Sequence, residues 1–140
     1  MTVNPLRASH HDRLRAVCIA EPRIEAVFLF GSQADGYARP DSDIDLGLLL
    51  TEPLSLTARL DLEVQLCQAL DRDDVDVVYL RDAPIALRFR AIQGQILYER
   101  IPDRVSDFMQ RTMVEYYDFQ HVLDTYEREF ARSLEQDYDL

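Results

Sequence analysis

Residues 30–49 read FGSQADGYARPDSDIDLGLL, and this stretch determines how the rest of the chain is interpreted. An apolar run, IEAVFLF, ends where the stretch begins, and a second apolar run follows it after Gly31-Ser32 and ten polar, turn-rich residues. Short apolar runs bounded by turn residues are typical of buried strands. We therefore expect strands over 24–30 and 43–50, joined by a polar loop.

Two aspartates, Asp43 and Asp45, open the second expected strand. Side chains alternate along a strand, so the two carboxylates are expected on one face, about 7 Å apart, while Ile44 points into the core. Neighbouring carboxylates repel each other, and a divalent cation between them relieves that repulsion. Ligands that are all oxygen favour Mg²⁺ or Mn²⁺ over zinc. The pair therefore predicts a metal site.

Gly31 and Ser32 stand at the end of the first expected strand, beside that metal site. Glycine lets the backbone turn sharply and approach a ligand, and serine offers a hydroxyl and an N–H to a phosphate oxygen. A third carboxylate, Asp76, lies within the apolar run over 75–80. Burial would be costly for an unpaired aspartate, so its position is explained if it faces the same metal site. These features predict a phosphate cradle beside two metal ions, with Asp76 also helping to deprotonate an attacking hydroxyl.

This combination resembles the signature of the DNA polymerase β-like nucleotidyltransferase superfamily. Within it, the chain is most similar to the minimal nucleotidyltransferase antitoxins encoded beside HEPN-domain toxins, and the resemblance covers most of residues 15–100. It implies a Mg²⁺-dependent enzyme (two ions, with Mn²⁺ as an alternative) that transfers AMP from ATP to a tyrosine of a HEPN ribonuclease toxin. Pyrophosphate is released and the toxin is silenced. The implied nucleotide contacts are Gly31 and Ser32, and the implied catalytic metal ligands are Asp43, Asp45 and Asp76.

The loop over 33–42 departs from the pattern of similar proteins, many of which carry arginines there. Asp35 lies in this stretch and Arg39 is its only basic residue. Arg39 is therefore the expected basic contact to the triphosphate, and a surface ion pair is the alternative role. Arg88 and Arg90, in a later expected helix, are weaker candidates for the same contact.

The remaining elements follow from hydrophobic periodicity. We expect an α+β fold in which a small mixed sheet is flanked by helices, which is also the core that the resemblance implies. From Val105 onward, apolar residues recur at half-heptad spacing and predict a long amphipathic C-terminal helix with a break near Tyr117. We divide the chain into a nucleotidyltransferase core, 1–102, and a helical extension, 103–140, packed on the same domain. The other expected elements are helices over 6–20, 56–70 and 84–93, a strand over 75–80 and a short edge strand over 95–98.

The formal net charge is −11, and all fifteen basic residues are arginines. This acidity argues against direct binding to DNA or RNA, whose phosphates need a basic surface. The lack of lysine excludes a lysine nucleophile and a P-loop. The sequence has neither a long apolar stretch nor a signal sequence, so we expect a cytoplasmic protein that does not span a membrane.

A chain of 140 residues leaves little surface beyond the core for holding an acceptor. We therefore expect the acceptor to be a partner protein, the HEPN toxin, that docks on the acidic C-terminal helix. Covering the core is the other role open to that helix. Two alternative functions stay open: a nucleotidyltransferase acting on a small molecule such as an aminoglycoside, and an antitoxin that acts by binding alone.

Overall fold

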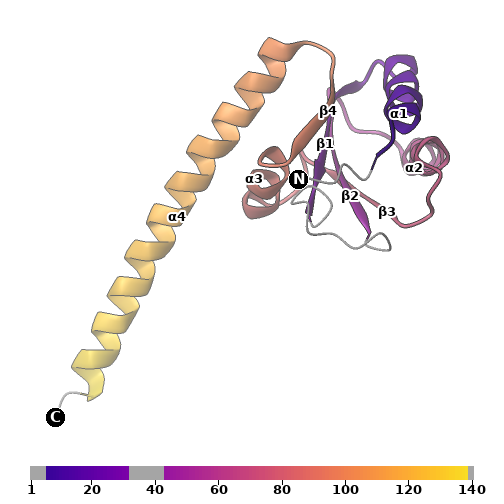
Figure 1. Ribbon diagram of the computed structural model, residues 1–140. Helices are drawn as coiled ribbons and strands as arrows, with labels where there is room; N and C mark the ends of the chain where they lie inside the picture. Colours follow the sequence, from indigo (N-terminus) through magenta and orange to yellow (C-terminus); the bar gives the residue numbers. More distant parts are fainter. Residues whose placement is uncertain (1–5, 32–42, 139–140) are drawn as a thin grey trace.

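The computed structural model describes residues 6–31 and 43–138, with side chains up to residue 136. Helices cover both sides of one four-stranded sheet, and a last helix runs away from it (Figure 1). Each of the first seven elements lies within two residues of its predicted range. The elements in chain order are α1 (Ala8–Ala20), β1 (Ile24–Phe30), β2 (Ile44–Leu50), α2 (Leu56–Leu70), β3 (Val75–Tyr79), α3 (Ile85–Ile92), β4 (Gln95–Glu99) and α4 (Pro102–Tyr138).

The sheet has the strand order β3-β2-β1-β4. β1 pairs antiparallel with both β2 and β4, whereas β2 pairs parallel with β3. Parallel neighbours need a crossover connection, and α2 provides it. The predicted α+β fold with a small mixed sheet is therefore confirmed, and β4 is an edge strand as expected.

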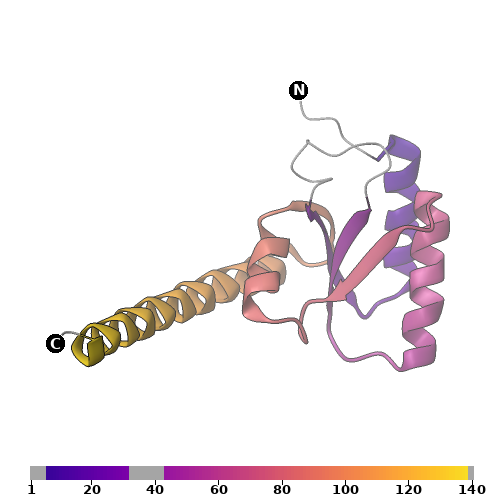
Figure 2. The ribbon, with the colours of Figure 1, turned by 90° about the horizontal axis from the view of Figure 1, so that it is seen from below.

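Two apolar layers cover the two faces of the sheet (Figure 2). On one face α1 and α2 lie over strand residues such as Val27, which shares a cluster with Leu66 of α2. On the other face α3 and the first turns of α4 lie over Phe28, in a cluster with Ala91 and Val105. Because both faces are covered, neighbouring residues of a strand are apolar alike, and β1 and β2 read as nearly continuous apolar runs.

The ends of α2 and the turn after it determine where β3 begins. Ser55 caps α2, because its side chain accepts a hydrogen bond from the N–H of Ala58 at 3.2 Å. Asp71 ends the helix in the left-handed conformation, with φ 53°. In the following turn the Arg72 guanidinium donates to both carboxylate oxygens of Asp74, at 2.7 and 2.5 Å. This pair holds the chain immediately before β3.

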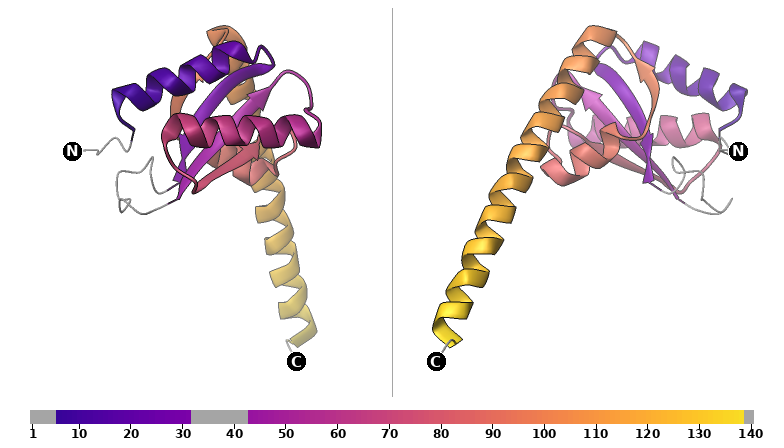
Figure 3. Two further views of the ribbon diagram at one scale, coloured as in Figure 1. Left: turned by 90° about the vertical axis from the view of Figure 1, so that its right-hand side faces the viewer. Right: turned by 60° about the vertical axis from the view of Figure 1, so that its left-hand side comes forward.

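The last helix, α4, is continuous from Pro102 to Tyr138, so the predicted break near Tyr117 is wrong. Residues 103–138 contain neither proline nor glycine, and nothing else interrupts the helical hydrogen bonds. Packing on the domain, which we expected for the whole extension, is seen up to Tyr117, whereas residues 118–136 are all exposed (Figure 3). Despite this length, no helix that the structure describes is apolar enough to cross a membrane.

Candidate active site

Three adjacent strands bring predicted site residues to one end of the sheet. Phe30, the last residue of β1, is paired with Asp45 near the start of β2. Asp45 in turn is paired, in parallel register, with Asp76 near the start of β3. Neighbouring strands lie about 5 Å apart, and paired residues point to the same face. Asp45 and Asp76 therefore lie side by side, while Asp43 stands just before β2.

Gly31 follows β1 directly and contacts the second strand. Its backbone φ is 77°, in the left-handed region that residues with a Cβ rarely adopt. A Cβ added to Gly31 would collide with the carboxylate of Asp45. Glycine is therefore required here for two independent reasons, its backbone conformation and the space that Asp45 occupies.

Asp45 differs from the other two aspartates in exposure, and both of their carboxylates repel it. Burial raises the pKa of the Asp45 carboxyl above its ordinary value, and the nearby Asp76 and Asp43 carboxylates raise it further, while the Arg90 guanidinium lowers it. Asp45 is half-buried, whereas Asp43 and Asp76 are exposed. The burial that made Asp76 conspicuous in the sequence is therefore absent. A cation at this end of the sheet would relieve the repulsion among the three.

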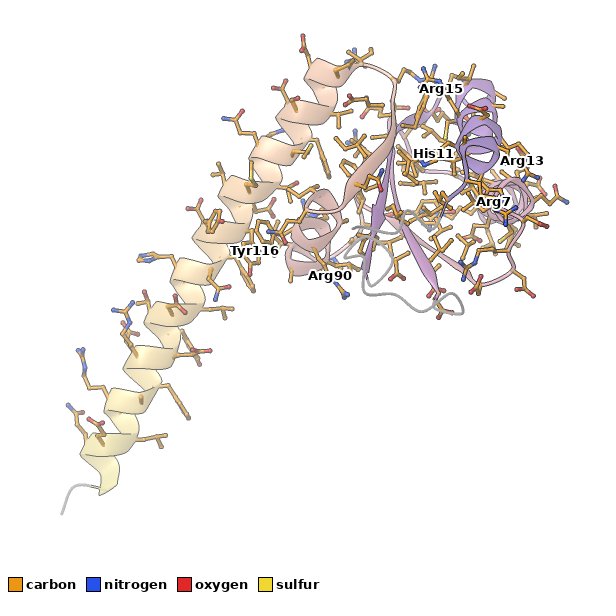
Figure 4. All side chains as sticks on the ribbon, in the orientation of Figure 1. Arg7, His11, Arg13, Arg15, Arg90 and Tyr116 are labelled. Carbon is orange, nitrogen blue, oxygen red and sulfur yellow. The ribbon has the colours of Figure 1, made fainter. Side chains whose placement is uncertain are left out.

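Arg90 is the basic residue that the fold brings to these carboxylates. Asp45 lies on the α3 side of the sheet, two residues before Gly47, whose added Cβ would touch Ala91 of α3 at 3.3 Å. Arg90 belongs to the same helix and is exposed. Its positive charge lowers the pKa of the Asp45 carboxyl. Figure 4 shows its side chain at the end of the molecule where β1 ends and β2 begins.

Arg88 has a different role from Arg90. Its Nε donates to the carbonyl of Ala83 at 3.0 Å, and its two terminal nitrogens donate to Glu115 of α4 at 3.3 and 3.1 Å. Residues two apart on a helix point to roughly opposite sides, so only one of the two arginines can face the carboxylates. From the sequence, both were weaker candidates for the triphosphate contact. Their spacing did not indicate which of the two would lie near the carboxylates.

The carboxylates suit a divalent cation in donor chemistry, because all the oxygens are anionic and two of the three groups are exposed. Within residues 6–31 and 43–138, however, no group of three or more His, Cys, Asp or Glu side chains is already gathered around a metal position. The sheet pairs two of the carboxylates directly, and Asp43 lies outside the strand. Their role as metal ligands stays a prediction.

Residues 12–103 match the family described as "Polymerase beta, Nucleotidyltransferase". The matched segment contains Gly31, Asp43, Asp45, Asp76 and Arg90, and therefore all the strand ends described above. The chain belongs to this nucleotidyltransferase family. Its fold follows the expectation from the sequence, and the roles of its carboxylates stay predictions.

One relative of this nucleotidyltransferase is the protein adenylyltransferase MntA of Shewanella oneidensis. The two are 38% identical over 78 residues, which are 55% of this chain and 55% of MntA. The match thus spans about half the length of this curated relative.

Solved structures resemble the nucleotidyltransferase over more of its length. A chain from a crystal structure described as a toxin–antitoxin with AMP-PNP is 27% identical, with a TM-score of 0.70, over 86% of this chain and 98% of its own. A second likeness is to a complex of a tri-AMPylated Shewanella oneidensis HEPN toxin with an MNT antitoxin. There the identity is 24% and the TM-score 0.66, over 87% and 96% of the two chains, so this likeness shows the fold alone.

Two predicted nucleotide contacts of the nucleotidyltransferase, Ser32 and Arg39, lie outside the described residues. Their roles stay predictions. Gly31 is described, and it lies against the Asp45 carboxylate.

One cavity among the described residues lies away from the carboxylate site. It has a volume of about 490 Å³ and lies at the opposite end of the sheet, next to Glu25 at the start of β1 and Leu49 at the end of β2. Ion pairs cross it, because Glu25 lies 3.5 Å from Arg81 and 3.6 Å from Arg104. These contacts join the start of α4 to the sheet, which is a structural role.

Proposed function

We propose that this nucleotidyltransferase is the antitoxin of a HEPN toxin–antitoxin pair, and that it transfers AMP from ATP to a tyrosine of the toxin. One observation carries the proposal: the sheet sets Asp45 beside Asp76, with Gly31 against the Asp45 carboxylate. The similarity to a protein adenylyltransferase and to a chain of a toxin–antitoxin structure with AMP-PNP supports the choice of nucleotide and acceptor.

In this proposal Asp43, Asp45 and Asp76 would hold Mg²⁺, as two ions, with Mn²⁺ as an alternative. Asp43 and Asp76 repel the Asp45 carboxylate, and bound cations would relieve that repulsion. When bound, the ions neutralise the triphosphate charge and stabilise the leaving pyrophosphate. ATP as the donor agrees with the cytoplasmic location that we propose.

Gly31, Ser32, Arg39 and Arg90 contact the triphosphate. The absence of a side chain at Gly31 lets the backbone approach a phosphate beside Asp45. Arg90 adds a positive charge from α3, on the side of the sheet where Asp45 lies. The shortage of arginines in the loop over 33–42 is thereby offset from a different element.

The transfer itself is a displacement at phosphorus. The tyrosine hydroxyl oxygen attacks the α-phosphorus of ATP, and the bond from that phosphorus to the oxygen bridging the β-phosphate breaks. Pyrophosphate leaves with the bond electrons. The hydroxyl proton passes to the Asp76 carboxylate, which is exposed and able to release it to water. The product is a tyrosine joined to AMP by a phosphodiester bond.

The proposal is tested by mixing the chain with the HEPN-domain protein encoded beside it, ATP labelled in the α-phosphate, and Mg²⁺. Label is expected on the partner protein, and it should disappear with D43N/D45N. A matched control is D12N/D61N, which removes two exposed carboxylates from α1 and α2.

Other outcomes identify the alternative functions. A toxin that is inhibited without label, by both the wild type and D43N/D45N, would show an antitoxin that acts by binding alone. Label that goes to an aminoglycoside and not to the protein would show a small-molecule nucleotidyltransferase.

A further inference from the structure

The second half of α4 carries large apolar side chains that nothing in the described structure covers. We call five of them the tail stripe: Phe119, Leu123, Tyr126, Phe130 and Leu134. The exposed fraction of these five residues ranges from 36% to 68%. Exposed apolar groups are ordinary when they are scattered, but a contiguous row of them on one helix face marks an interaction site.

The tail stripe continues the helix face that packs on the domain. In the first half of α4 the residues that face inward are Val105, Phe108, Thr112 and Tyr116, spaced three or four apart. Phe119 follows three residues later, and the stripe keeps the same spacing to Leu134. At 3.6 residues per turn this spacing preserves one face. The stripe therefore looks to the side of α4 on which the domain lies.

The direction of α4 places the tail stripe beyond the carboxylate end of the sheet. Figures 1 and 3 show the second half of the helix extending beyond the end of the sheet at which β1 ends and β2 begins. The helix is fixed to α3 where it leaves the domain, because the ring of Phe89 stacks on Tyr116 with 3.8 Å between centroids. The pair Arg88–Glu115, at 3.1 Å, fixes the same turn.

Charge around the stripe is asymmetric. Residues 118–136 hold five carboxylates and two guanidiniums. Glu127 and Glu129 lie on the two borders of the stripe, three residues from Phe130 and Tyr126 respectively. Arg128 lies two residues from both Tyr126 and Phe130, and therefore on the opposite side of the helix. The apolar row is thus bordered by negative charge.

We propose that the tail stripe is the docking surface for the acceptor protein, and that the acceptor presents an apolar helical face bordered by arginine or lysine. The inference rests on the proposed function, since it assigns the surface that recognises the AMP acceptor. A second copy of this chain is disfavoured as the occupant, because two stripes facing each other would bring their acidic borders together. A protein docked on the stripe lies on the domain side of α4, beside the carboxylate end of the sheet.

The test uses full-length variants and the HEPN-domain protein encoded beside the chain. L123A/F130A removes two of the five large apolar side chains of the stripe. Alanine is a strong helix former, so the helix is preserved at both positions. The control V114A/R132A makes a matched change on the opposite face, where Val114 is 58% exposed. Titration calorimetry should show binding of the partner weakened about tenfold or more by L123A/F130A and unchanged by the control. The thermal midpoint of both variants should equal that of the wild type, because the altered side chains are exposed.

Catalysis and docking are separated by D43N/D45N. That variant should bind the partner as tightly as the wild type and fail to label it. If no variant transfers AMP but the stripe variant still loses binding, the proposed function is wrong and the docking surface stands. If L123A/F130A binds and labels the partner like the wild type, the docking proposal is overturned. Light scattering that finds the wild type dimeric and L123A/F130A monomeric would also overturn it, in favour of a second copy.

Discussion

The carboxylate of Asp45 occupies the space in which a Cβ of Gly31 would lie. Gly31, directly after β1, and Asp45, on the adjacent β2, are fourteen positions apart in the sequence and are therefore constrained together. The chain turns at Gly31 with φ 77° and passes directly over the carboxylate that the active site requires. The contact fixes the distance between the predicted phosphate cradle and the predicted metal ligands.

The Gly31→Ala variant is expected to lose both stability and AMP transfer. Placing alanine in the left-handed region costs about 1–2 kcal/mol, and the collision with Asp45 adds to this cost. Urea unfolding measures the loss. In G31A/D45A the collision is removed, so part of the stability should return while activity stays absent. Equal unfolding free energies for G31A and wild type would contradict this account of the contact.

Asp76→Asn is expected to abolish AMP transfer and to leave the fold as stable as before, or more stable. Folding raises the pKa of Asp45, first because the carboxyl is partly buried and further because Asp76 lies beside it. An acid with a raised pKa favours the folded state at low pH, and that contribution is lost as the pH rises through the folded pKa. At neutral pH the charged pair therefore opposes folding, and D76N relieves it. Urea unfolding at pH 7 without Mg²⁺ checks the sign, and a clear loss of stability would contradict it.

Arg90→Ala is expected to raise the KM for ATP by about tenfold, the effect of losing one charge-assisted contact to phosphate. Arg88→Ala is the matched control, since Arg88 bonds to Ala83 and Glu115 instead. R88A should leave the KM for ATP unchanged and lower stability by about 1 kcal/mol. Steady-state kinetics on both variants distinguish the two arginines, and equal effects on KM would refute the assignment.

Truncation after Tyr117 is expected to leave a folded domain with an unchanged thermal midpoint, because residues 118–136 are exposed. Circular dichroism and thermal melting test this. Removal of residues 104–140 is the matched contrast. It takes away Val105, which is fully buried, and Phe108, which packs on the same cluster, so that variant should be destabilised by several kcal/mol. A folded domain without residues 104–140 would show that α4 contributes little to the core.

The strands and helices could be predicted because local pattern and burial agree. Both faces of the sheet are covered, so its strands are apolar along their length. The apolar runs over 24–30 and 75–80, which are bounded by turn residues, therefore sufficed to locate β1 and β3. The proximity of Asp45 and Asp76 also followed, since both stand near the start of an expected strand. Their direct pairing depends on the parallel register of β2 and β3, which no local pattern encodes.

What could not be predicted depends on how elements meet in space. Arg88 and Arg90 are two residues apart on one helix, and only the packing of α3 on the sheet decides which of them approaches Asp45. The break predicted near Tyr117 falls where α4 packs on α3, through an aromatic cluster of Phe89, Tyr116 and Tyr117. In the structure both tyrosines contact Phe89, and the helix continues through them.

The continuity of α4 has a consequence for how such chains can change over evolutionary time. One residue inserted between Tyr117 and Leu123 would rotate everything beyond it by about 100° and shift it by about 1.5 Å, which would turn the apolar row away from the domain side. Seven inserted residues would nearly restore the rotation but move the row about 10 Å along the axis. Changes in the length of α4 are therefore tolerated only when they nearly restore the rotation of the helix. Each such change would also require a partner protein whose binding surface has shifted by the same distance.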